Sequence, residues 1–246
     1  MRAGRISAVA AVAVLVLGLV PGPVMGSDWR DALSRLVPQS RPAPTSAQMA
    51  EAIRQALAQG GDRAVRTLGR RDGFFRNPRV RIPMPPELRR VESVLRQLGQ
   101  GRAADEFVRT LNRAAERAVP IAAQVLRKTI SHMSVRDAVN IVRGPDDAAT
   151  RYFERRDGKE LSHRFLLIVR QTTAHVGVTR AYKRLMAQAG PAVRLMGIHE
   201  VDLDRYVTGR TVDGLFVVMA QEEKRIRRHP VARTTQLLKE VFGYRG

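Results

Sequence analysis

The chain of 246 residues contains no cysteine. This absence excludes disulfide bonds, thiolate metal sites, cysteine nucleophiles and lipid attachment to a cysteine near the N-terminus. A chain of this length does not depend on disulfide bonds, because its core can grow large enough to fold unaided. A hydrophobic content of 44% is sufficient for such a core.

The sequence also lacks the short motifs that commonly mark an enzyme. It contains no HExxH, no GxSxG, no phosphate-binding P-loop and no glycine-rich dinucleotide fingerprint. Residues 199–204 (HEVDLD) resemble a metal cluster at first sight, but Asp202 is better explained as the cap of a helix that begins at Leu203. We therefore expect no cofactor and no metal, name no catalytic residue, and favour a binding protein over an enzyme.

The N-terminus has the pattern of a secretory leader. Arg2 and Arg5 precede an apolar stretch at 6–20, and Pro21 and Pro23 interrupt the chain soon afterwards. A membrane-spanning helix needs about 20 apolar residues, so this stretch is too short for a stable transmembrane anchor. We predict that residues 1–26 are a cleaved signal peptide. The mature protein would then be periplasmic, with no stable transmembrane segment.

Positive charge exceeds negative charge by a wide margin. The chain has 43 Lys and Arg against 23 Asp and Glu, a formal net charge of +20, which falls to +18 without Arg2 and Arg5. Such a surface favours an anionic envelope lipid or polymer, or another envelope protein; we do not expect nucleic acid. Nearly all of this charge is arginine, and a GC-rich genome would produce the same bias without a selected partner. The sequence leaves both explanations open.

Helical patterns repeat along almost the whole chain. Thr45 and Gln48 have the spacing of a capping box, and apolar residues then recur at helical intervals as far as Gly60 and Gly61. Only 79–82 has the character of an extended segment, and one such segment cannot form a sheet. We predict an all-α protein: a compact multi-helix bundle of about nine to eleven helices, with no sheet. Residues 27–44 would form a short helix and a proline-rich linker, and 45–246 a single helical domain.

Further helices are predicted along the rest of the domain. One begins at Pro86 and ends before Gly99, and another occupies 103–118, with Pro120 at a kink or in the first turn of the next helix. The remaining helices are predicted at 135–143, 146–156, 159–175, 178–188, 202–207, 211–228 and 235–242.

The least helical part of the domain, 73–83, combines aromatic residues, arginines and prolines. Arg76 and Arg79 within it could bind phosphate. We favour the alternative that this run is a packed connector whose Phe75, Val80 and Ile82 fill the core.

Two acidic groups are also candidates for a site. Glu222 and Glu223 flank an apolar helical stripe, where paired carboxylates could share a proton or bind a cation. Because the chain is so rich in arginine, we predict instead that both are paired with arginine. On the 103–118 helix, Asp105, Arg109, Asn112 and Glu116 form a polar stripe. We predict that this stripe is solvated.

Several sequence blocks together resemble a known family. The blocks are NPRVRIP (77–83), LRRVESVLRQLGQG (88–101), ADEFVRTLNRAAERAVP (104–120), VGVTRAYKRLM (176–186), DLDRYVT (202–208), DGLF (213–216) and ARTTQLLKEVFG (232–243). They resemble a family of bacterial exported proteins catalogued as a domain of unknown function. The resemblance implies an all-helical domain behind a signal sequence in Gram-negative bacteria, and it assigns no catalytic or binding residue. This chain is richer in arginine than the family, for example at 225–228.

These observations favour a periplasmic helical binding or interaction protein that engages an anionic envelope component. One alternative is a carrier of an apolar or lipid-like ligand in a cavity between helices. Its adaptable lining would come from methionines: Met84, Met133, Met186, Met196 and Met219. A second alternative is a hydrolase with a site around Glu222 and Glu223.

Overall fold

The computed structural model describes residues 42–136, 138–190 and 201–244. The described residues from Ala43 onward belong to one compact unit. The predicted signal peptide and most of the predicted 27–44 linker lie outside the described residues. Within the described residues no helix is long and hydrophobic enough to span a bilayer.

The described residues form eight α-helices and no strand, which confirms the all-α prediction. The helices are α2 (Ser46–Leu68), α3 (Arg89–Gln97), α4 (Gly101–His132), α5 (Ala138–Arg143), α6 (Ala148–Val176), α7 (Val178–Ala189), α9 (Leu203–Arg228) and α10 (Gln236–Gly243). Two short 3-10 turns, Pro86–Leu88 and Pro230–Ala232, precede α3 and α10.

Eight is fewer than the nine to eleven helices predicted, because several predicted breaks are absent. The segments 146–156 and 159–175 are one helix, α6, and the segments 202–207 and 211–228 are one helix, α9. Helix α4 passes through Pro120 without a break. The caps were easier to predict: the capping box of Thr45 and Gln48 and the Asp202 cap are both present.

Helix α2 also continues beyond the predicted end at Gly60 and Gly61. A Cβ atom at Gly60 would lie 3.4 Å from the Met219 backbone of α9, and one at Gly61 would lie 3.1 Å from the Leu126 side chain of α4. The two glycines therefore allow close contact with two neighbouring helices. Packing, rather than helix termination, explains them.

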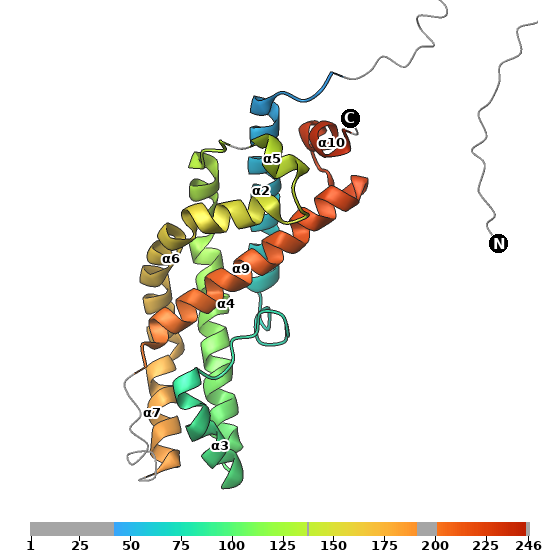
Figure 1. Cartoon of the computed structure of the whole chain (residues 1–246). Helices are drawn as coiled ribbons and strands as arrows, with labels where there is room; N and C mark the ends of the chain where they lie inside the picture. Colours follow the sequence, from blue (N-terminus) through green and yellow to red (C-terminus); the bar gives the residue numbers. More distant parts are fainter. Residues whose placement is uncertain (1–41, 137, 191–200, 245–246) are drawn as a thin grey trace, which may run out of the picture. The chain divides into compact units, whose positions relative to one another are not determined.

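The four longest helices surround the main core. Helix α9 packs on α2 and α6, and α4 packs on α2 and α6. Figure 1 shows α9 crossing obliquely over α2 and α4, while α3 and α7 lie beside one part of α4. A second, smaller cluster forms where α10 covers α2 and the end of α9. It contains Ala52, Ala56, Ile226, Ala232, Leu238 and Val241.

Candidate functional site

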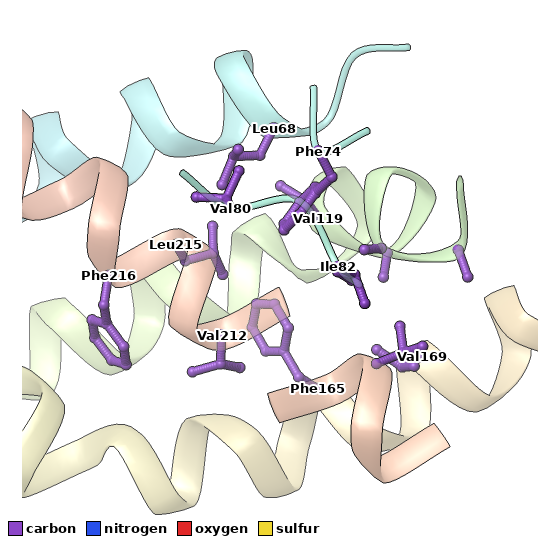
Figure 2. Close-up of a cluster of buried hydrophobic side chains, with 14 of the residues drawn as sticks. Leu68, Phe74, Val80, Ile82, Val119, Phe165, Val169, Val212, Leu215 and Phe216 are labelled. Atoms are coloured by element: carbon purple, nitrogen blue, oxygen red, sulfur yellow. The ribbon is translucent and has the colours of Figure 1, made fainter. Parts of the chain in front are cut away.

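The connector at 69–85, between α2 and the 3-10 turn Pro86–Leu88, is anchored by apolar side chains. Phe74, Val80 and Ile82 are buried, and Figure 2 shows them in one cluster with Leu68 of α2 and Leu215 of α9. The preference for a packed connector is thus supported, except that Phe74 is the buried aromatic residue and Phe75 is half-buried.

Two polar residues of α4 hold the backbone of this connector. One carboxylate oxygen of Glu116 accepts hydrogen bonds from the N–H groups of Phe74 and Phe75, both at 3.1 Å. Asn112 accepts from the N–H of Ile82 at 2.9 Å and donates to its carbonyl at 2.8 Å. Asn112 is 0% and Glu116 3% exposed, so the prediction of a solvated stripe was wrong for both. Helix α4 is covered on several sides, and a single apolar face does not describe it.

The outer side of the connector is strongly basic. Its arginines are all exposed: Arg70, Arg71, Arg76, Arg79 and Arg81. Asp72 is the one acidic residue of 69–85. It lies 3.4 Å from Arg76 and 2.8 Å from Arg113 of α4, so its single charge is shared between two arginines. The predicted candidate Arg76 is therefore partly neutralised, whereas Arg79 has no carboxylate partner among the described residues.

An aromatic ring at the connector contacts two further arginines. The guanidinium carbon of Arg81 lies 4.7 Å from the centre of the Phe75 ring, and that of Arg109, from α4, lies 5.1 Å away. Guanidinium groups are attracted to the negative face of an aromatic ring, and this contact leaves their N–H edges available for other partners. Arg109 was predicted only as part of the polar stripe, and nothing in its sequence neighbourhood points to Phe75.

Glu222 and Glu223 are buried and paired, as predicted. Glu222 accepts hydrogen bonds from Arg225 and from Gln59 of α2, the latter at 2.9 Å. Burial raises the pKa of the Glu222 carboxyl, but the hydrogen bonds from Arg225 and Gln59 outweigh it and the net shift of the pKa is downward. A carboxyl group that is ionised and paired in this way is a poor general acid.

Glu223 joins α9 to the start of α6. Its carboxylate accepts from the N–H groups of Ala149 and Thr150, at 2.9 and 2.8 Å, and from Arg227 at 2.8 Å. Arg227 also donates to the carbonyls of Ile141 and Val142 at the end of α5. All these bonds lie within the protein and connect three helices, so the pair has a clear structural role.

A hollow with a volume of about 580 Å³ lies between α2, α5, α9 and α10. Its lining is mixed, because Met49, Val142 and Phe242 share it with Arg143 and Asp146. The described methionines that were expected to line a carrier cavity do not line this hollow. Met84, Met133 and Met219 are buried in the main core, Met186 is half-buried against it, and Met196 lies outside the described residues.

A family model described as a protein of unknown function, DUF4197, matches residues 43–243 of this all-helical chain. The chain belongs to the DUF4197 family. This membership confirms the resemblance inferred from the sequence blocks. No curated protein and no solved structure matches the chain.

The DUF4197 match covers both the basic connector and the Glu222 and Glu223 pairs, but it assigns a role to neither. Assignment therefore rests on geometry. The two acidic candidates are engaged inside the protein. The basic connector, by contrast, is held rigidly and carries charge that the described residues do not balance.

Proposed function

We propose that this DUF4197 protein is a periplasmic binding protein whose basic connector, 69–85, engages an anionic lipid surface of the envelope. The observation that carries the proposal is the imbalance of charge on the connector. Five exposed arginines accompany one acidic residue, which Arg113 also shares. Positive charges gathered on one segment attract anionic surfaces more effectively than the same charges dispersed.

The rigidity of the connector supports the same proposal. Buried side chains and the hydrogen bonds to Asn112 and Glu116 fix its backbone. Little backbone freedom is therefore lost when a ligand binds, and a preorganised surface binds with a smaller entropic cost. Arginine bias from the genome alone would not require the charges to lie on a segment held in this way.

The two alternatives have weaker support. The hydrolase requires free or proton-sharing carboxylates, whereas Glu222 and Glu223 are both bound by arginine. The carrier has in its favour the hollow of about 580 Å³, which falls within the usual range for ligand sites. Most of the expected methionine lining, however, is packed into the core.

Vesicle binding tests the proposal. The exported protein, whose first residue mass spectrometry should place near Ser27, is mixed with neutral phosphatidylcholine vesicles and with vesicles that also contain phosphatidylglycerol. We expect binding to the anionic vesicles at low salt and much weaker binding at near-physiological salt, because salt screens exposed charges. The double variant Arg76→Gln, Arg79→Gln should lose most of this binding.

A matched variant controls for the loss of two positive charges. Arg170 of α6 and Arg180 of α7 are exposed and have no carboxylate partner among the described residues. The double variant Arg170→Gln, Arg180→Gln should bind nearly as well as the wild type. Equal losses in both variants would show that the connector is not the site. No binding at low salt, or binding to heparin but not to vesicles, would reject a lipid surface.

A further inference from the structure

Arg81 and Arg109 are unusual among the arginines of the connector region because they contact one ring from two different elements. Arg81 belongs to the connector and Arg109 to α4, and their guanidinium carbons lie 4.7 and 5.1 Å from the centre of the Phe75 ring. Both residues are exposed, and Phe75 is half-buried. The ring therefore contacts two guanidinium groups at the surface, and the two distances limit the separation of the guanidinium carbons to at most their sum, 9.8 Å.

The nearby acidic residues are occupied by other arginines. Asp105 and Glu106, one turn before Arg109 on α4, pair with Arg96 at 2.7 Å and with Arg184 at 2.6 Å. The two acidic residues closest to Phe75 in the connector and its anchor, Asp72 and Glu116, both pair with Arg113. No carboxylate among the described residues pairs with Arg81 or Arg109, so two positive charges remain at the ring without a counter-charge.

The backbone that carries these groups is held in place before any ligand arrives. The backbone N–H of Phe75 is bound by Glu116, and Ile82, which comes directly after Arg81, is bound through both its N–H and its carbonyl by Asn112. Arg109 lies within the regular helix α4. Stacking on the ring limits the freedom of both arginines, so less conformational entropy is lost on binding.

This arrangement suits an anion with two charges and several terminal oxygens. Each guanidinium can donate two parallel N–H bonds, and a carboxylate has oxygens for only one such pair. A phosphate monoester has three terminal oxygens and a charge of about −1.5 to −2 at neutral pH. It can therefore accept from both arginines and neutralise both charges.

We propose that Arg81, Arg109 and Phe75 form a binding site for a phosphate monoester, which would be a lipid headgroup or a soluble ester. The lipid form of this inference rests on the proposed function. The inference adds that the protein binds a membrane with phosphomonoester lipids more tightly than a membrane with phosphodiester lipids at the same surface charge density.

The test compares two anionic vesicles of matched surface potential. One contains phosphatidic acid, a phosphomonoester, and the other contains phosphatidylglycerol, a phosphodiester. The wild type should bind the phosphatidic acid vesicles about tenfold more tightly, a factor that corresponds to one additional charge-assisted interaction. The variant Arg81→Lys, Arg109→Lys should lose this preference and still bind both vesicles, because lysine keeps the charge but not the planar fork.

The matched control, Arg170→Lys, Arg180→Lys, should retain the tenfold preference. A second variant, Phe75→Leu, keeps most of the apolar volume of Phe75 and removes the aromatic face. It should weaken the preference, and far-UV circular dichroism shows whether it is folded. A wild type without preference, or a preference that persists in the Arg81→Lys, Arg109→Lys variant, would contradict the proposed site.

Titration with glycerol phosphate separates this inference from the proposed function. In NMR spectra of the wild type, the side-chain N–H resonances of two arginines should shift when glycerol phosphate is added. These two resonances should be absent from the spectrum of the Arg81→Lys, Arg109→Lys variant. If glycerol phosphate shifts them although no anionic vesicle binds, the phosphate site stands with a soluble ligand and the lipid surface is rejected. If anionic vesicles bind without headgroup preference and no resonance shifts, the proposed function stands and the phosphate site is rejected.

Discussion

Glu116 shows how one buried charge can shape an exposed surface. It lies inside the protein, yet it binds two backbone N–H groups of the connector that carries the exposed arginines. Arg113 provides its counter-charge at 2.6 Å. Its contribution to the proposed ligand binding would therefore be indirect, because it holds the segment that is proposed to bind.

Replacement of Glu116 by alanine should destabilise the protein by about 2–4 kcal/mol. Two backbone N–H groups would lose their acceptor, and Arg113 would lose one of its two carboxylate partners. Urea unfolding measures the effect. The control is Glu106→Ala, which removes an exposed pair with Arg184 from the same helix and should cost at most about 1 kcal/mol. Equal costs for the two variants would show that Glu116 does not anchor the connector.

The sequence draws attention to the arginines of the connector but not to the inner contacts that support it. Arg76 and Arg79 stand out in the printed sequence, because prolines and aromatics surround them. Asn112 and Glu116 were assigned to the solvent because a helical wheel assumes one buried face, whereas α4 is covered by α2, α6, α7 and the connector. The contact of Arg109 with Phe75 depends on tertiary packing between α4 and the connector, which local patterns do not reveal.

At the scale of secondary structure, glycine has opposite roles within α9. A Cβ atom at Gly214 would lie 2.7 Å from the buried ring of Phe74, so this position allows the connector to approach the helix. At Gly209, in the same helix, a Cβ atom would have nothing within 4 Å. The sequence shows two glycines, and only the structure distinguishes their environments.

Substitution by alanine at these two positions should change the free energy of unfolding in opposite directions. Gly209→Ala should stabilise the protein by about 0.5–1 kcal/mol, because alanine favours the helical backbone more than glycine does. Gly214→Ala should destabilise it by about 1–3 kcal/mol, because Phe74 cannot move without disturbing the core. Thermal unfolding of the two variants decides the question. Stabilisation by both substitutions would show that Phe74 is not tightly packed against α9.

Breaks within the helices were harder to predict from the sequence than the caps at helix starts. Caps such as Thr45 and Asp202 depend on neighbouring residues and were found from sequence alone. Breaks were predicted at Gly60 and Gly61, at Pro120 and between 156 and 159, whereas the helices continue through all three positions. At Gly60 and Gly158 the glycine lies against a neighbouring helix. Gly158, for example, packs against the ring of Phe216.

At the scale of the whole molecule, apolar packing is divided unequally. Most buried side chains belong to the main cluster, while α10 contributes Leu238 and Val241 to a small cluster with α2 and α9. A helix of eight residues held by so few side chains should open more often than the long helices.

Hydrogen exchange should therefore reveal two levels of protection. Amides of α10 should exchange faster than those in the middle of α2, α4 and α9, because they need only local opening. Leu238→Ala should increase exchange in α10 and leave the middle of α4 almost unchanged. Uniform protection across all four helices would indicate that α10 unfolds only together with the main core.

The contacts of α2 also bear on the order in which the chain can fold. Its Gln55 accepts a hydrogen bond from Thr235, 180 residues further along the chain, and its Gly60 packs on α9. Contacts between residues so distant in sequence require the closure of a long loop, which slows folding. A chain that ends before α9 would leave the apolar side of α2 uncovered, and such a fragment should aggregate. The first helix of the domain is therefore completed by the last two, and stable folding waits for synthesis of the whole domain.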